Sequence, residues 1–420
     1  MIYIYRICSD FVLCVYLRGT MMEITTYMLL IAFGIAFVMG AVVNKTNFCT
    51  MGAVSDWVNM GDKNRLRSWM LAIAAALIGV LILEGTGVAS VDSTLPPYRA
   101  EGFAWLRFIV GGLMFGIGMT LASGCGNKTL IRIGGGNAKS IFVLIVAGMF
   151  AYFMSKTAFY EVLFHPWVVA TTIDLGAYNI NGQDLGSITA AITGKEVEIS
   201  RSFIGAIFAA LLVAIIFKSA EFRKQYEHIF SGLVVGAAVI AAWYFTGGAM
   251  GDEWKETAEF LDEIPVGVAT QSLTFINPMG ETFFYAMSPS NTLLISFGMA
   301  ALAGIIVGSF VYAVLSKSFR FEWFSSVSDF LQHLIGATLM GIGGVLAMGC
   351  TIGQGITGVS TLSIGSMLAL VSIVFGSALT MKIQYYKMMH EDDATFIKAL
   401  LSSLVDLKLL PSKLRQLENF

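Results

Sequence analysis

The stretch GIGMTLASGC at residues 116–125 recurs as GIGGVLAMGC at residues 341–350. The two copies are identical at seven of ten positions, and each closes an apolar run with a Gly-Cys pair. The paired cysteines, Cys125 and Cys350, lie 225 residues apart. Two related apolar segments that each end in a thiol indicate an internal repeat that brings both thiols to one place.

The composition around this repeat is that of a membrane protein. Of the 420 residues, 56% are hydrophobic and 13% are charged, about half the charged fraction of a typical soluble domain. Many runs approach the roughly 20 apolar residues that cross a bilayer as a helix. We predict an all-α polytopic protein embedded in the lipid bilayer, with about nine spans at residues 24–43, 68–85, 103–122, 139–157, 201–217, 229–246, 291–315, 331–348 and 360–380.

Other classes are disfavoured by what the sequence lacks. There is no basic tract interleaved with aromatic residues, so nucleic acid is not an expected partner. The five cysteines include no CxxC pair, which disfavours a disulfide framework and structural zinc. Gly353, Gly355 and Gly358 spell GxGxxG, but no strand precedes them, as a dinucleotide site requires. We expect no metal and no cofactor.

The loop charges predict how the spans are oriented. Lys and Arg gather in alternate connections: residues 43–68, the loop after Cys125, 217–229, 315–331 and the tail beyond 381. The connections 158–200 and 247–290 are acidic. Because basic loops face the cytoplasm, the N-terminus is expected outside and the C-terminus inside. The spans before the two repeated cysteines are the third and the eighth, so they run in opposite directions, and the repeat is inverted.

This topology divides the chain. We expect one transport domain at residues 22–380, with repeat one at about 22–157 and repeat two at about 229–380. Residues 381–420 are expected to form a cytoplasmic tail, in which leucines among charges predict a surface helix. Residues 1–21 form an extension of doubtful role, and we assign no function to its Cys8 and Cys14.

Each Gly-Cys pair precedes a stretch that is too short and too glycine-rich to span a bilayer. We predict re-entrant half-helices there, with Gly124 and Gly349 letting the backbone turn inside the membrane. The first N–H groups and the positive dipole end of such a helix attract anions. The predicted anion path is therefore lined by both cysteines and by the residues that flank them, Gly124, Gly126, Gly349 and Thr351.

A single cysteine in a membrane helix is usually a small packing residue, but two at matching positions favour a function. Cys49, in VVNKTNFCTMGAVSDW, belongs either to a further re-entrant element near the cytoplasmic mouth or to an ordinary interface. The related place in the second half, residues 307–323, has no cysteine. Lys128 and Arg132 are candidates for attracting anions at the inner mouth, although the positive-inside bias alone accounts for them.

Three blocks in this order resemble the YeeE/YedE sulfur-transport family, and within it the thiosulfate importers. They are GAVVNKTNFCTMGAVSDW at 40–57, GGLMFGIGMTLASGCGNKTLIRIGGGN at 111–137, and ATLMGIGGVLAMGCTIGQGITG at 337–358. The resemblance implies an hourglass-like bundle of nine spans with four half-helices in a bacterial inner membrane. It also implies that thiosulfate moves inward past Cys350, then Cys125, then Cys49. Family members often work with a small TusA-like sulfur-carrier protein in the cytoplasm.

One departure and three alternatives accompany this interpretation. The family has small residues and an aromatic after the central Gly-Cys, whereas this chain has Asn127 and Lys128, and an added cation can change which anion is preferred. The chain is predicted not to be an enzyme. The alternatives are a membrane sulfurtransferase that forms a cysteine persulfide, a structural subunit, and a transporter of sulfite, sulfide or a selenium oxyanion.

Overall fold

The computed structural model describes residues 2–261, 263–390 and 395–417, with side chains described from residue 23 onward. Within these ranges, nine helices are long and apolar enough to cross a membrane. This confirms the predicted all-α polytopic membrane protein. The nine lie in α1 (Ile2–Thr46), α3 (Asn64–Gly85), α4 (Trp105–Leu121), α6 (Ala138–Lys156), α10 (Val197–Phe217), α11 (Tyr226–Gly247), α14 (Phe297–Leu315), α15 (Val327–Leu346) and α16 (Ile364–His390).

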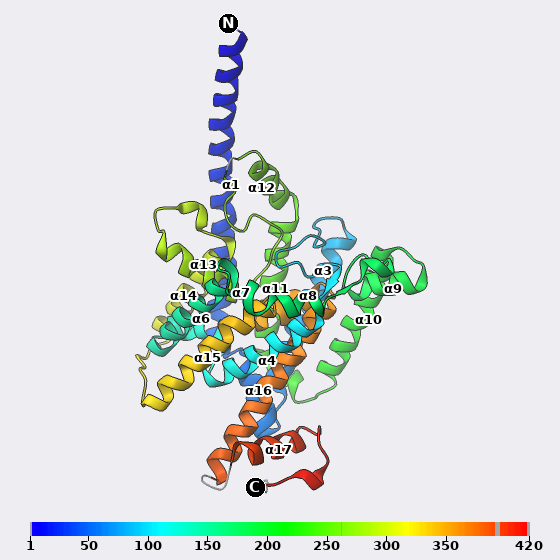
Figure 1. The fold of residues 1–420 in the computed structure, drawn as a ribbon, viewed down its shortest axis with the longest axis vertical. Coiled ribbons are helices and arrows are strands. Elements are labelled where there is room, and N and C mark those ends of the chain that lie inside the picture. The colour runs from blue at the N-terminus through cyan, green and yellow to red at the C-terminus, as the bar shows by residue number, and fades with distance from the viewer. Residues whose placement is uncertain (1, 262, 391–394, 418–420) are drawn as a thin grey trace.

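Apart from the start of α1, two span boundaries differ from the prediction by more than four residues. The seventh span begins at Phe297 rather than at residue 291, because Thr292–Leu294 forms a 3₁₀ turn whose first N–H groups are capped by the Asn291 side chain. The ninth continues to His390, ten residues beyond its predicted end. Residues 2–21 continue α1 as a helix that projects from the bundle (Figure 1). The side chains of Cys8 and Cys14 lie outside the described part of the chain.

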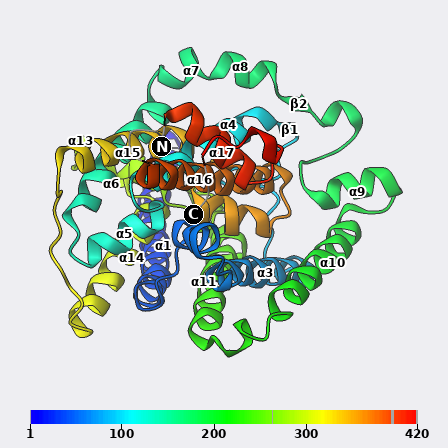
Figure 2. The same ribbon diagram turned by 90° about the horizontal axis from the view of Figure 1, so that it is seen from below.

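The helices pack in matched pairs (Figure 2). α1 packs on α14 and α11 packs on α3, while α4 packs on α16 and α15 packs on α6. Suppose that α1 is exchanged with α11, α3 with α14, α4 with α15, and α6 with α16. The α1–α14 contact then becomes the α11–α3 contact, and the α4–α16 contact becomes the α15–α6 contact. Such a pattern is expected of two repeats related by a two-fold axis, and it supports the inverted repeat.

Glycines bring α4 and α15, the two helices that carry the repeated phrase, into direct contact. A Cβ on Gly118 of α4 would lie 2.7 Å from the carbonyl oxygen of Gly336 of α15, and the reverse distance is the same. A Cβ on Gly343 would lie 2.7 Å from the carbonyl oxygen of Gly111. Because Gly111 pairs with Gly343 and Gly118 with Gly336, α4 and α15 run antiparallel. Small residues at such crossings let membrane helices approach closely.

Smaller elements cover the two ends of the bundle (Figure 1). On the side of the N-terminus lie α7 (Phe159–Leu163), α8 (His165–Ala170), α9 (Leu185–Thr193) and α12 (Ala249–Glu259). A two-stranded antiparallel sheet, β1 (Gly102–Phe103) and β2 (Ile173–Asp174), joins this region. At the opposite end the tail forms α17 (Phe396–Asp406), which packs on α16.

Candidate functional site

Four short helices end inside the bundle instead of crossing it, and we call them the half-helices. They are α2 (Thr50–Ser55), α5 (Gly126–Gly134), residues 351–360 with a π-helical segment at Gly353–Gly358, and α13 (Ile276–Met287). The first three begin directly after Cys49, Cys125 and Cys350. The sequence predicts re-entrant elements after Cys125 and Cys350, and at Cys49 such an element is one of the two alternatives.

The sequence prediction missed α13, because residues 247–290 are acidic and were assigned to an outer loop. The structure buries Thr274, Phe275 and Ile276, the residues that lead into α13 and begin it. α13 packs on α6 and α14, as α2 packs on α16 and α3, so it is the counterpart of α2. The proposed equivalence with residues 307–323 is therefore wrong, since those residues belong largely to α14. Pro278 in the first turn was the available signal.

The residue two positions before each of the three cysteines has a left-handed backbone. The φ values are 52° at Asn47, 57° at Ser123 and 63° at Met348. The turns expected at Gly124 and Gly349 thus fall one residue earlier. After each turn the glycine N–H closes the preceding helix, donating to Met119 or Gly344 at 2.8 Å. Left-handed residues other than glycine carry strain, which accumulates at functional sites.

The half-helices bring the three thiols together. Cys49, Cys125 and Cys350 are 6%, 1% and 0% exposed, and none is in a disulfide. The thiols of Cys49 and Cys125 are neighbours, and Cys125 also faces Thr351 and the Cys350 thiol. A Cβ on Gly126 would lie 3.8 Å from the Cys350 Cβ, so the starts of these two half-helices are neighbours.

Backbone N–H groups surround these sulfur atoms. The Gly52 N–H donates to Cys49 Sγ at 3.5 Å. The Ile352, Gly353 and Phe275 N–H groups are directed at Cys350. These are the first N–H groups of helices, which lack partners within their own helix. The arrangement therefore combines thiols with the positive ends of helix dipoles.

The two predicted cations have different surroundings. Lys128 Nζ donates to Asn47 Oδ1 at 3.1 Å, which links α5 to the turn before Cys49. Arg132 Nη1 donates to the Ser123 carbonyl oxygen at 2.6 Å, which stabilises the left-handed turn before Cys125. Lys128 is therefore placed beside the thiols, whereas Arg132 supports the backbone that positions one of them. Across the described ranges, no three His, Cys, Asp or Glu side chains come together as metal ligands.

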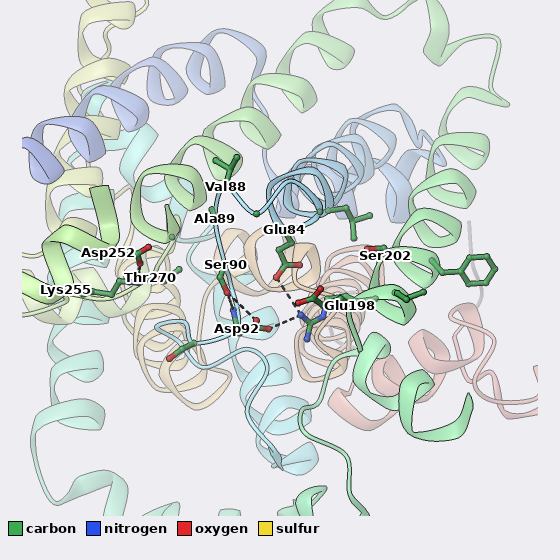
Figure 3. Close-up of a pocket in the computed structure, with 18 residues that line it drawn as sticks. Glu84, Val88, Ala89, Ser90, Asp92, Glu198, Ser202, Asp252, Lys255 and Thr270 are labelled. Atoms are coloured by element: carbon green, nitrogen blue, oxygen red, sulfur yellow. Dashed lines mark hydrogen bonds and ion pairs between the residues drawn. The ribbon is translucent and has the colours of Figure 1, made fainter. Parts of the chain in front are cut away.

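A cavity of about 910 Å³ opens on the side of the N-terminus (Figure 3). Glu84, Asp92 and Arg201 line this cavity. With Arg99 and Asp184 behind them, they form a group of five charged residues that we call the ion-pair cluster. Arg99 contacts Glu84 at 2.5 Å and Asp92 at 3.0 Å, and Arg201 contacts Asp92 at 2.9 Å and Asp184 at 3.2 Å. The cluster contains three acids and two cations, so it does not form an anion site.

The ion-pair cluster is joined to the Cys350 half-helix. Arg99 Nε donates to the Thr361 carbonyl oxygen at 3.1 Å, and the Tyr98 hydroxyl donates to the Gly353 carbonyl oxygen at 2.8 Å. Burial raises the pKa of Asp92 and Asp184, but the two guanidinium groups outweigh burial and hold both pKa values below the usual 3.8. Sequence analysis missed this cluster because its members come from four separate segments of the chain.

Comparison with known proteins connects this geometry to a family. A model of the family described as sulphur transport matches residues 45–379, which include all three cysteines. The thiosulfate transporter TsuA of Spirochaeta thermophila is 25% identical over 347 residues, covering 82% of this chain and 95% of its own. The thiosulfate transporter TsuA of Escherichia coli is 23% identical over 354 residues, covering 80% of this chain and 89% of its own.

These matches confirm the resemblance that the three sequence blocks indicate. Both relatives are named as transporters, in agreement with the expectation of a transporter rather than an enzyme. With a family match across most of its length and an all-α membrane architecture, the chain belongs to the sulphur-transport family of multi-pass membrane proteins.

Proposed function

We propose that this protein imports thiosulfate, or a closely related sulfur-containing anion, across a bacterial inner membrane. The observation that carries the proposal is the meeting of three buried cysteines at the N-terminal ends of three half-helices. The names of the two relatives support thiosulfate as the cargo. The loop charges support an outer N-terminus and a cytoplasmic C-terminus.

In this mechanism the path combines two kinds of weak interaction. Helix N-terminal N–H groups offset part of the hydration that the anion loses. Neutral thiols donate S–H hydrogen bonds to its terminal sulfur, and burial disfavours the charged thiolate, which would repel the anion. Weak, closely spaced sites permit release as well as binding, as conduction requires. The anion then moves from Cys350 to Cys125 to Cys49, with Gly124, Gly126, Gly349 and Thr351 flanking the thiols.

Lys128 gives the inner end of this path its positive charge. It lies beside Cys49 and Cys125, while the stretch after Cys350 has no cation. An arriving anion is therefore attracted toward the cytoplasmic end. A TusA-like carrier protein in the cytoplasm is the partner that would receive the sulfur there.

Lys128 also favours one rival function, a membrane sulfurtransferase, because an activated thiol needs a nearby base or cation. In that reaction a Cys125 thiolate attacks the outer sulfur of thiosulfate, the sulfur–sulfur bond breaks, and sulfite leaves with the electron pair. The product on the enzyme is a persulfide. Mass spectrometry of Cys125 after exposure to thiosulfate separates the two functions, since transport leaves an unmodified thiol.

The test of transport is the uptake of labelled thiosulfate by cells that express Cys→Ala or Cys→Ser variants. We expect Cys125→Ala and Cys350→Ala to abolish uptake and Cys49→Ala to reduce it strongly. Cys14→Ala is the matched control and should leave uptake unchanged. Normal uptake by Cys125→Ala at an unchanged protein level would overturn the proposed path. Competition by sulfate, sulfite and selenite identifies which anions share it.

A further inference from the structure

Unpaired polar atoms gather at the half-helices. Among the described residues, nine buried side-chain oxygen or nitrogen atoms lack a hydrogen-bond partner at normal distance. Five of the nine lie on, or directly before, the first turn of a half-helix: those of Asn127, Thr274, Asn277, Thr351 and Gln354. Buried polar atoms are almost always paired, and each exception requires an explanation. Two of the five, the Thr274 and Thr351 oxygens, belong to hydroxyl groups, which can donate to a ligand.

The two threonines differ from other buried threonines of the chain. Thr120, Thr129 and Thr380 each donate to the carbonyl oxygen four residues earlier. The corresponding carbonyl for Thr351, that of Ala347, already accepts from Gln354 Nε2 at 2.7 Å. Thr274 precedes α13 and has no helical carbonyl behind it. Neither hydroxyl therefore donates to a carbonyl oxygen of its own helix.

Each free hydroxyl lies beside a thiol of the proposed path. Thr351 faces Cys125, and Thr274 faces Cys350. Thr274 is 7% exposed and Thr351 is 0% exposed, so neither is satisfied by bulk water. Thr274 also lies so close to Gly353 that a Cβ on Gly353 would collide with its hydroxyl. The backbone is thus built to admit Thr274 at the N-terminal end of the Cys350 half-helix.

We infer that Thr274 and Thr351 form an oxygen-recognition subsite, in which each hydroxyl donates to an oxygen atom of the anion while the adjacent thiol meets its sulfur. The inference rests on the proposed function and adds the basis of its selectivity. The three unpaired amide atoms are oxygens, which accept but do not donate, so the hydroxyls are the members suited to an anion. The substrate class is an anion with both a terminal sulfur and several oxygens. Sulfide lacks the oxygens, and sulfite lacks the terminal sulfur.

The subsite also explains a difference between the repeats. The half-helix α2 begins at Cys49, whereas its counterpart α13 is preceded by Thr274 and has no cysteine. The half of the path that is proposed to face outside therefore has a hydroxyl one residue before the N-cap of its half-helix, whereas the inner half has a third thiol at the N-cap itself. An anion that enters on the outer side would meet oxygen recognition at its first thiol, Cys350.

The test compares Thr→Val with Thr→Ser at both positions in thiosulfate uptake and in thermal unfolding of the purified protein. Valine removes the donor and serine keeps it. We expect KM to rise about tenfold in Thr274→Val and in Thr351→Val, since each loses a hydrogen bond to a charged ligand. The serine variants should stay within about twofold of the parent. The unfolding temperature should not fall in the valine variants, because they remove an unpaired buried hydroxyl.

Thr380→Val is the matched control. It removes a hydroxyl that donates to the Gly376 carbonyl oxygen at 2.8 Å, so it should lower the unfolding temperature without changing KM. An unchanged KM in both valine variants, with thiosulfate uptake intact in the parent, would overturn the inference alone. A lower unfolding temperature in both valine variants would also overturn it, because the hydroxyls would then be structural. Absence of uptake by the parent protein would overturn the proposed function and, with it, the inferred substrate class.

Discussion

Adding one methyl group at either of two matching glycines should destabilise the bundle. Gly116 and Gly341 occupy the first position of the two copies of the repeated phrase. Gly116 on α4 faces the Ile373 backbone of α16, and Gly341 on α15 faces the Ala147 backbone of α6. We predict that Gly116→Ala and Gly341→Ala lose stability by similar amounts, because the two repeats use these glycines for the same contact.

The distances set the size of the effect. A Cβ on Gly341 would lie 2.5 Å from the Ala147 carbonyl oxygen, whereas ordinary contact begins at 3.4 Å, and the Gly116 Cβ would lie closer still to the Ile373 carbonyl oxygen. The helices must separate by about 1 Å, and overpacking of this kind costs about 1–3 kcal/mol. Alanine regains up to about 1 kcal/mol through its higher helix propensity. We therefore expect a net loss of about 1–2 kcal/mol for each variant.

The assay is thermal unfolding of the purified protein in one detergent, with Gly34→Ala as the control. A Cβ on Gly34 meets no atom within 4 Å, so this variant should be as stable as the parent or more stable. Both test variants should unfold at lower temperature than the control. If Gly116→Ala and Gly341→Ala match Gly34→Ala, the close helix contacts described here are wrong. A loss confined to one of them would contradict the equivalence of the repeats.

Three further predictions concern charged side chains. Arg201→Gln leaves the fully buried carboxylate of Asp184 without its cation and should cost about 3 kcal/mol in unfolding free energy, and an unchanged unfolding temperature would refute the pairing. The pKa values of Asp92 and Asp184 are held below 3.8, so their stabilising contribution is complete above that pH and is lost as pH falls further. The stability difference between the parent and Arg201→Gln, measured by unfolding over a pH series, should therefore shrink as the pH falls below about 4, and a difference that grows there would contradict the pairing. Lys128→Gln should raise the KM for the anion and weaken the dependence of KM on ionic strength. Arg132→Gln should lower the free energy of unfolding by about 1 kcal/mol and leave the dependence of KM on ionic strength unchanged. The reverse pattern would contradict the roles assigned to these two residues.

The sequence predicted those features that recur along the chain with a period or a repeat. Hydropathy located the nine spans, because each requires a long uninterrupted apolar run. The matching Gly-Cys pairs located two half-helices, whereas the third cysteine left a half-helix and an ordinary interfacial position as alternatives. Loop charge predicted opposite directions for the third and eighth spans, and the antiparallel contact of Gly118 with Gly336 agrees with it.

The features that escaped prediction depend on contacts between distant segments. α13 is short and follows an acidic stretch, so its burial is visible only once α6 and α14 enclose it. The ion-pair cluster joins Glu84, Asp92 and Arg99 to Asp184 and Arg201, about 100 residues further along, and no local pattern announces such a pairing. Left-handed Ser123 and Met348 carry no sequence signature, because the usual signal is glycine at that position.

The two repeats agree in packing and differ in chemistry, and the two-fold arrangement explains both. Matching glycines of the two repeats make matching contacts: Gly116 packs on α16, and Gly341 packs on α6, the counterpart of α16. A substitution at either glycine therefore disturbs an equivalent interface. The first residues of the half-helices are not held by such helix–helix contacts, because they surround the thiols of the proposed path. Cys49 and Lys128 accordingly occur on one half only, and the fourth half-helix has Phe275 at its N-cap and no cysteine. In the path that we propose, thiols occur along the whole length, the cation Lys128 lies toward the inner end, and Thr274 lies toward the outer end beside Cys350. This asymmetry would hold an anion in one orientation, with its sulfur and its oxygens distinguished.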